Sequence, residues 1–421
     1  MRGVAELLRT AGFRRLAVSY GLNELAWGLG TVALAVVVYA RTNSPIATTA
    51  LFLASTFAPA LLAPAITAAV DRLPRRRALA GLYLGEAILF CILALIASAA
   101  PLAGVFALAL LDGSLALAGR ALTRASVAET LADAAQLRRG NALLNVMWST
   151  GSIVGPALGG VIVAVAGTGA SLAGAATVFA AMCVLLARAP LPAGTQNREG
   201  WVSAVRGGIA HVAGRPALRR LMAAQGGLLV ACTLAVPIEV VYAAESLQAG
   251  DGAYGLLLGA WGGGMVIGSL IFARAQSVPL LRLMVSALAT IAAGYTVMAI
   301  APGLAIAAVG AALGGLGNGI SVVAMLQTLQ ERLEDRFQAR VMSLWEALGA
   351  ASIGTGYLIG GVLASLTSPR LVFAVAAVAV AGVALVVHRA LPVGRARSDL
   401  APLGPSALSG QEERDLQAAA V

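Results

Sequence analysis

Runs of mostly apolar residues alternate with short polar gaps along most of this 421-residue chain. A helix of about 20 residues crosses the roughly 30 Å hydrocarbon core of a bilayer. The pattern therefore predicts an all-α polytopic membrane protein with twelve transmembrane helices. The predicted spans are 16–39, 46–70, 78–99, 101–119, 141–166, 170–187, 221–244, 252–273, 279–300, 302–326, 341–366 and 371–388.

A long polar stretch, 189–216, interrupts the pattern after the sixth span. It predicts two six-helix bundles, 1–188 and 217–390, joined by a cytoplasmic linker. Apolar linker residues recur at helical spacing, which favours an amphipathic helix at the membrane surface over a plain linker. These residues are Trp201, Val205, Ile209 and Val212. The tail 391–421, rich in Pro, Gly, Ser and charged residues, is predicted to be disordered in the cytoplasm.

The basic residues, all 29 of them arginine, are distributed unevenly among the gaps. Alternate gaps hold 27 of the 29, and only Arg41 and Arg370 lie in the other set. Cytoplasmic loops carry the excess of basic residues, so both chain ends are expected in the cytoplasm. With 59% hydrophobic and 11% charged residues, against about 25% charged in soluble domains, the composition agrees with a multi-pass protein of the cell membrane.

The composition also excludes several functions. Without lysine, the chain has no phosphate-binding P-loop and no amine for a retinal or pyridoxal Schiff base. The net charge of +10 sits at helix ends, where arginine meets lipid headgroups, so membrane lipids and not nucleic acid are the expected partners. Because the two histidines are dispersed, we expect no metal site, no cofactor and no enzymatic activity. We also expect the protein to be a monomer.

Two features connect the predicted halves with a known family. Segments 155–160 and 356–361 form a weak internal repeat at one constant offset, and the loop after the second span reads Asp71-Arg-Leu-Pro-Arg-Arg-Arg77. Together with the two bundles, they resemble the major facilitator superfamily (MFS). Transporters of this kind rock two bundles around a central site. The resemblance covers nearly all of the chain, from Phe13 to about Arg389.

In the family, this loop latches the two bundles together on the cytoplasmic side. The physical basis is that a carboxylate pairs with arginine and is favoured at a helix N-terminus. The resemblance implies this role for Asp71, Arg72, Arg75 and Arg76. The sequence departs from the family pattern at Thr67 and Pro74, where glycine is usual. The alternative is that the arginines only anchor the topology.

A second motif, in the fifth predicted span, is similar to the fifth-helix signature of antiporting exporters in the superfamily. Glycines four apart let helices approach closely in lipid, and proline bends a helix. The resemblance favours export over import and implies a flexing helix between the bundles; the alternative is ordinary glycine packing. The motif residues are Gly151, Gly155, Pro156, Gly159 and Gly160.

A third family motif is missing. Drug exporters of the family carry an arginine in the fourth helix, four residues before a glycine, but this chain has Ala109 before Gly113. The usual proton-coupling arrangement therefore does not carry over. More loosely, the chain also resembles drug, macrolide and siderophore efflux members of the superfamily.

A charged side chain at the bilayer centre costs about 2.5–3.5 kcal/mol, so each carboxylate within a span is a functional candidate. Glu24, Glu86 and Asp112 fall near mid-membrane, whereas Glu239 and Glu346 lie nearer the span ends. We expect Glu24 or Asp112 to couple proton entry to substrate exit, with Glu86 as a further candidate. The alternative is a neutral carboxyl group that only joins helices by hydrogen bonds.

Aromatic and polar residues in the spans predict an amphipathic pocket, although single aromatics more often serve packing. The candidates are Asn23, Trp27, Asn145, Trp148, Trp261 and Glu346. The sequence thus predicts a proton-coupled exporter of amphipathic small molecules or drugs. Arginine is missing from mid-span positions, which disfavours the alternative of importing a polar nutrient. A polytopic membrane enzyme or a sensor is the remaining alternative.

Overall fold

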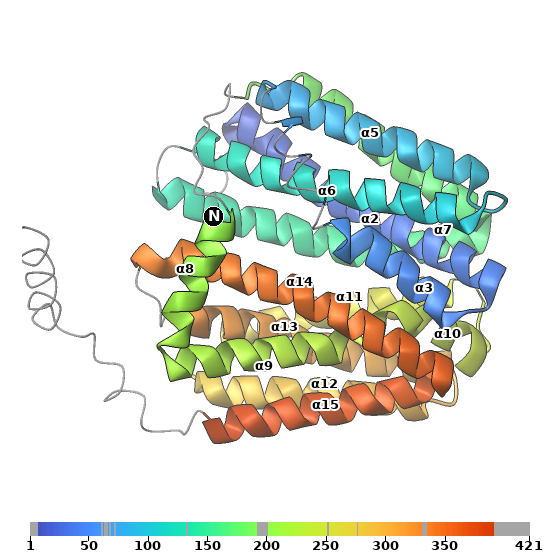
Figure 1. The fold of residues 1–421 in the computed structure, drawn as a ribbon, viewed down its shortest axis with the longest axis vertical. Coiled ribbons are helices and arrows are strands. Elements are labelled where there is room, and N and C mark those ends of the chain that lie inside the picture. The colour runs from blue at the N-terminus through green and yellow to red at the C-terminus, as the bar shows by residue number, and fades with distance from the viewer. Residues whose placement is uncertain are drawn as a thin grey trace, which may run out of the picture.

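The computed structural model describes residues 7–59, 62, 66, 69–70, 73–131, 134–191, 201–250, 252–275, 277–330 and 335–390. Every regular element in these residues is helical, and the helices form two bundles that lie side by side (Figure 1). The first bundle holds α2 (Ala11–Thr42), α3 (Pro45–Phe52), the π-helix η1 (Leu53–Phe57), α5 (Arg75–Ile96), α6 (Leu102–Thr130) and α7 (Ala134–Ala187). The second follows α8 (Trp201–Ala213) and holds α9 (Pro216–Thr233), η2 (Val236–Ile238), α10 (Glu239–Val241), η3 (Tyr242–Ser246), α11 (Ala253–Arg274), α12 (Leu280–Ile300), α13 (Leu304–Gln330), α14 (Asp335–Leu366) and α15 (Pro369–Ala390).

Ten helical stretches in the described residues are long and apolar enough to cross a membrane. Two further spans complete the predicted twelve. One is the shorter pair α3 and η1. The other arises because α7 contains two spans that turn at Gly167, whose φ of 84° is readily adopted only by glycine. The prediction of an all-α polytopic protein with twelve transmembrane helices is confirmed.

The fourth span differs from its prediction. The apolar run ends at residue 119, but α6 continues to Thr130 and carries Arg120 and Arg124. The expectation that these two arginines lie in a loop is wrong, because α6 continues through both of them. Each guanidinium group has a partner on α2: the partly buried Arg120 pairs with Glu24, and the exposed Arg124 donates to the Tyr20 hydroxyl.

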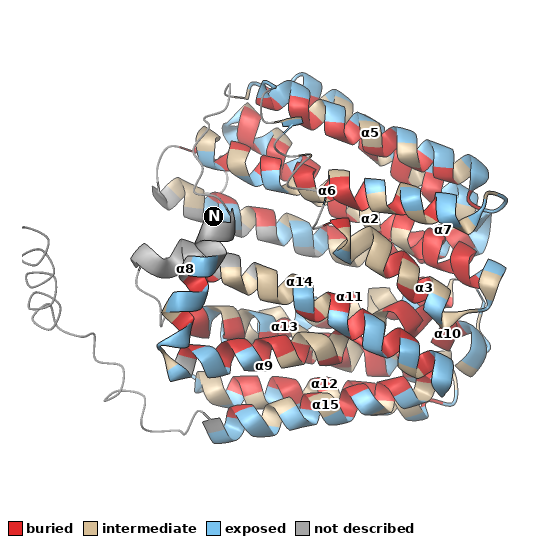
Figure 2. Cartoon of the chain, in the orientation of Figure 1, coloured by how far each residue is buried: buried red, intermediate tan, exposed pale blue. Residues whose placement is uncertain are grey.

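Aromatic side chains lie at the centre of each bundle. In the first, the Phe179 ring stacks with those of Tyr83 and Phe90, with ring centroids 6.3 and 5.4 Å apart. In the second, Phe373 lies against Tyr242 at 4.6 Å. Figure 2 shows buried residues where helices meet and exposed residues on the outward faces, many of which are apolar. Such outward faces suit contact with lipid tails.

The helix predicted in the linker is present as α8, which lies at one end of the bundles and packs against α14 and α9 (Figure 1). Its residue Val212 is buried and Ile209 is exposed, while the side chains of Trp201 and Val205 lie outside the described residues. The starts of α5 and α9, with their arginines, lie at the same end, which we call the arginine-rich end. The opposite, arginine-poor end includes the turn at Gly167.

Arg41 and Arg370, the two exceptions to the arginine alternation, both bind helix ends at the arginine-poor end. Arg41 Nη1 donates to the carbonyl of Ala97, the residue that ends α5, at 2.8 Å. Arg370 donates to the carbonyls of Ser246 and Ala299, at 3.2 and 3.4 Å, near the ends of η3 and α12. The last carbonyls of a helix have no partner within it, and a cation there is favourable. These contacts explain why the two arginines depart from the pattern.

We expect Arg370→Ala to destabilise the purified protein by about 1–3 kcal/mol, because hydrogen bonds to a charged donor are lost. The matched control is Arg389→Ala, an exposed arginine at the other end of α15, which should change stability by less than about 0.5 kcal/mol. Denaturant titrations followed by tryptophan fluorescence measure both. Equal stabilities of the two variants would contradict the capping role.

Candidate functional site

An ion pair between the buried Glu24 and the partly buried Arg120 joins α2 and α6 in the first bundle. Arg120 Nη1 lies 3.1 Å from Glu24 Oε1, and the Glu24 side chain is only 5% exposed. Ser152 of α7 donates a longer hydrogen bond, 3.5 Å, to the other oxygen of Glu24. Glu24, a predicted site residue, is therefore held by groups from two other helices.

A second arginine on the same face of α6 also contacts α2. Arg124 Nε donates to the Tyr20 hydroxyl at 2.9 Å, and its guanidinium carbon lies 5.6 Å from the Tyr20 ring centroid. The sequence held a signal for this arrangement: Arg120 and Arg124 are four residues apart, so they share one face of a helix. Sequence analysis missed Arg120 because it follows directly after an apolar run.

The predicted latch motif is only partly within the described residues, because Asp71 and Arg72 lie outside them. Arg76 is exposed at the start of α5. Arg75 is buried and binds Glu129 of α6 through Nη2 at 2.9 Å and Nε at 3.3 Å. This pair ties α5 to α6 within the first bundle. A contact between this loop and the second bundle stays a prediction.

Glu86 of α5 and Asp112 of α6 are the other two carboxylates near mid-membrane, and both are buried. Among the described residues, neither oxygen of Glu86 nor Oδ1 of Asp112 has a hydrogen-bond partner. The two carboxyl groups interact electrostatically with each other and with Arg120. An ionised carboxylate in such surroundings is costly, and a proton is the smallest ligand that neutralises it. Of the three predicted carboxylates, only Glu24 forms an ion pair with Arg120, whereas Glu86 and Asp112 interact with it at longer range.

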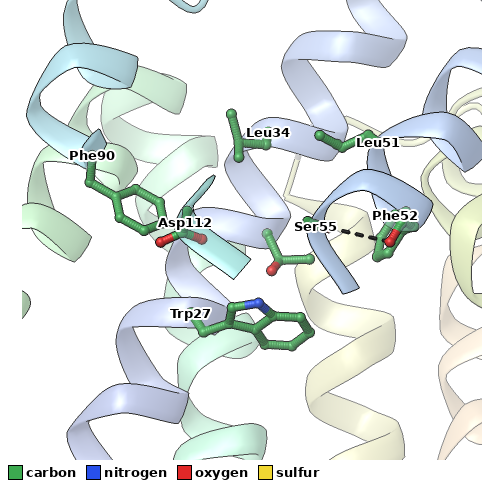
Figure 3. Close-up of a pocket in the computed structure, with 8 residues that line it drawn as sticks. Trp27, Leu34, Leu51, Phe52, Ser55, Phe90 and Asp112 are labelled. Carbon is green, nitrogen blue, oxygen red and sulfur yellow. Dashed lines mark hydrogen bonds between the residues drawn. The ribbon is translucent and has the colours of Figure 1, made fainter. Parts of the chain in front are cut away.

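A small pocket lies beside Asp112, between α2, α3, η1, α5 and α6 (Figure 3). Trp27, a predicted cavity residue, is part of its wall. Asp112, predicted as a proton-coupling residue, is also part of the wall. Sequence analysis missed the remaining wall residues, because ordinary apolar and hydroxyl side chains carry no signal of a pocket. The lining residues are Trp27, Thr31, Leu34, Leu51, Phe52, Ser55, Phe90 and Asp112.

The remaining cavity candidates do not gather at this pocket. Asn23 is fully buried, and neither polar atom of its side chain has a partner among the described residues. Trp148 is 40% exposed. Trp261 packs in the second bundle against Tyr295, with ring centroids 5.4 Å apart. The side chains of Asn145 and Glu346 lie outside the described residues.

The glycine motif of α7 lies against two helices. A Cβ on Gly151, Gly155 or Gly159 would come within about 3 Å of α2. Gly160 instead faces α11 of the second bundle, where a Cβ would lie 2.5 Å from the Cα of Gly255. The motif therefore packs within its own bundle on one side and touches the other bundle at its end.

The equivalent glycines of α14 repeat this arrangement. Gly356 and Gly360 face α9 of their own bundle, whereas Gly361 faces Thr49 on α3 of the first bundle. The two segments that repeat in sequence therefore also make equivalent helix contacts, one set in each bundle. Each bundle meets the other through the last glycine of the motif.

Further contacts join the bundles at the arginine-poor end. The Tyr39 hydroxyl donates to Glu245 Oε1 at 2.7 Å, from α2 to η3. The rings of Phe52 and Tyr357 meet edge to face, with centroids 5.6 Å apart. With the glycine contacts, these pairs hold the two bundles together at that end.

A family model described as Major Facilitator Superfamily matches residues 16–238 and 221–412 of the chain. The two matched regions correspond to the two bundles in order. No curated protein sequence matches the chain.

Several solved structures share the fold. A bacterial homologue of the iron transporter ferroportin, in an inward-facing state, aligns with a TM-score of 0.70 at 16% identity, over 91% of this chain and 98% of its own. The human organic anion transporter MFSD10 (TETRAN) aligns with a TM-score of 0.64 at 17% identity, over 90% and 99% of the two chains. The nucleoside transporter NupG aligns with a TM-score of 0.66 at 13% identity, over 89% of this chain and 98% of its own. At these identities, the likeness establishes the fold alone.

We expect Gly255→Ala to separate the bundles at the arginine-poor end, because the added methyl group would overlap the backbone of Gly160. Gly263→Ala is the matched control on the same helix, since a Cβ there meets nothing within 4 Å. Spin labels at Asn43→Cys and Gln248→Cys, both exposed, report the separation once the three native cysteines are replaced by alanine. Unchanged distance distributions in the Gly255→Ala protein would contradict the close contact.

Proposed function

The chain belongs to the major facilitator superfamily, and from that premise we propose that it is a proton-coupled exporter of amphipathic small molecules. The fold is that of a membrane transporter, in which two bundles move around a central site. The observation that carries the proposal is that three carboxylates, Glu24, Glu86 and Asp112, are buried in the first bundle and that one of them, Glu24, is paired with Arg120. Groups that gain and lose protons inside a membrane are typical of proton-driven transport.

Glu24 is the residue that we propose links a proton to movement. Its carboxylate is held by Arg120 of α6 and Ser152 of α7. A proton on Glu24 would remove the attraction to Arg120 and weaken the connection of α2 to α6 and α7. Because α7 also carries Gly160, which meets the second bundle, this change lies on the path from the charged group to the contact between bundles.

Asp112 and Glu86 supply the second part of the proposal. Their carboxyl groups are buried together, so placing a charge on both would be costly. We propose that Asp112 or Glu24 exchanges a proton with solvent when the bundles open, with Glu86 as its neighbour in the electrostatic network. The alternative, that the carboxyls only join helices, predicts no effect of their charge on coupling.

The direction of transport rests on the glycine and proline motif. Pro156 lies against Gly28 of α2, so the backbone hydrogen bond that proline removes is lost at a close contact of two helices. Its likeness to the signature of antiporting exporters supports export. We also propose that the working protein is a monomer in the cell membrane with its arginine-rich end in the cytoplasm, where the latch of Asp71, Arg72, Arg75 and Arg76 would act.

In cells that express the protein, accumulation of labelled amphipathic compounds should fall, and collapsing the proton gradient should restore it. In proteoliposomes, Glu24→Gln or Asp112→Asn should reduce gradient-driven export about tenfold or more, the scale of a lost coupling free energy of about 1.4 kcal/mol. Glu245→Gln, which keeps an acceptor for Tyr39, is the matched control and should retain transport.

Three results would contradict parts of this proposal. Undiminished gradient-driven export in both carboxyl variants would reject their role in coupling. Lower accumulation that does not depend on the gradient would reject proton coupling and keep export. Accumulation raised by the protein would reverse the direction.

A further inference from the structure

The pocket beside Asp112 has walls of two chemical kinds (Figure 3). Five apolar residues, the aromatic Trp27, Phe52 and Phe90 with Leu34 and Leu51, form one part, and Asp112 with two hydroxyl residues forms the other. Aromatic faces attract cations because their π-systems carry partial negative charge. A carboxylate attracts them directly. The pocket therefore combines the two groups that recognise positive charge.

Asp112 is the acidic residue of this wall, and one of its two carboxyl oxygens, Oδ1, is unpaired among the described residues. The residue is 3% exposed, and Oδ1 has no hydrogen-bond partner among the described residues. Arg120 influences Asp112 electrostatically, yet its ion pair is with Glu24. Figure 3 shows the Asp112 carboxyl group among Phe90, Trp27 and Ser55, which line the same pocket. A donor placed in the pocket would meet an unused acceptor.

Two glycines hold the walls in place. A Cβ on Gly30 of α2 would overlap the ring of Phe90, and a Cβ on Gly113 of α6 would overlap the carbonyl of Ser55. These close approaches bring the aromatic ring and η1 next to Asp112. The pocket is thus formed by specific backbone contacts among helices.

The size and the ligand atoms of the pocket limit what it can hold. It has room for about one water-sized group. An ammonium group is close to water in size and carries several N–H donors, which suits one carboxylate and the hydroxyls of Thr31 and Ser55. A trimethylammonium group is too large, and hard metal cations take six or more oxygen ligands.

We propose that this pocket binds the primary ammonium group of an amphipathic amine, which names the substrate class of the exporter proposed above and rests on that function. Charge-assisted hydrogen bonds to Asp112 and the neighbouring aromatic rings of Trp27 and Phe90 hold the cation. Phe52 meets Tyr357 of the second bundle, so the pocket borders the contact that must open during transport.

Isothermal titration calorimetry on the full-length protein in nanodiscs of neutral lipid tests this directly. The probes are benzylamine, benzyltrimethylammonium and benzyl alcohol, which share one ring and differ in charge and head size. The protein should bind benzylamine about tenfold or more tightly than either of the others. Asp112→Asn should abolish this preference, and Glu245→Gln should keep it.

Phe90→Leu is a second variant, which keeps the carboxylate and removes one aromatic face. It should weaken benzylamine binding about threefold or more and leave benzyl alcohol unchanged. Elution volume and melting temperature show whether each variant is folded. If Asp112→Asn does not fold, the Phe90→Leu result decides alone.

Equal binding of the three probes, no binding of benzylamine, or an undiminished preference in the folded variants would overturn the proposal. A different result would point to a metal-ion site and overturn the proposal: the protein binds sodium ions and not benzylamine, and Asp112→Asn loses the heat of sodium chloride titration. The assay needs no gradient, so it separates this proposal from the proposed function. Amine preference without export contradicts the transporter role alone, and export without amine preference contradicts the pocket alone.

Discussion

The free-energy cost of burying a charged side chain among apolar helices is the constraint on which the first bundle depends, because such a charge needs a partner. Replacing either partner of a buried ion pair leaves an uncompensated charge, which costs about 3–5 kcal/mol. Glu24 and Arg120 therefore fix α2 against α6, and Arg75 with Glu129 does the same for α5 and α6. The polar groups of this bundle thus connect helices that its apolar core also packs together.

The second bundle contrasts with the first in the part of the chain that the structure describes. Its centre is built from rings such as Tyr242, Tyr295 and Phe373, and the hydroxyls of both tyrosines donate to backbone carbonyls. Glu239 is buried there without a partner for Oε2 among the described residues. The two bundles thus share a backbone repeat while their polar contents differ. Such asymmetry suits a transporter in which one half responds to charge and the other supports it.

The sequence predicted the helices well and the site only in part, for physical reasons. Bilayer thickness fixes the length of an apolar run, so spans such as 280–300 and 253–274 were located within a residue or two. The burial of Glu24, Glu86 and Asp112 also followed from their place within the runs. The pairing of Glu24 with Arg120 did not, because it joins residues 96 positions apart through tertiary packing. The walls of the pocket depend on where α3 and η1 meet α6, which no local pattern encodes.

The contact of Gly160 with Gly255 has a consequence for how the molecule can change shape. Side chains can adopt other rotamers and allow a surface to slide by small steps, but two backbones in direct contact have no such freedom. Close-packed interfaces of this kind are bistable and do not deform continuously. The bundles should therefore part at this seam in one step, so the protein behaves as a switch with two positions.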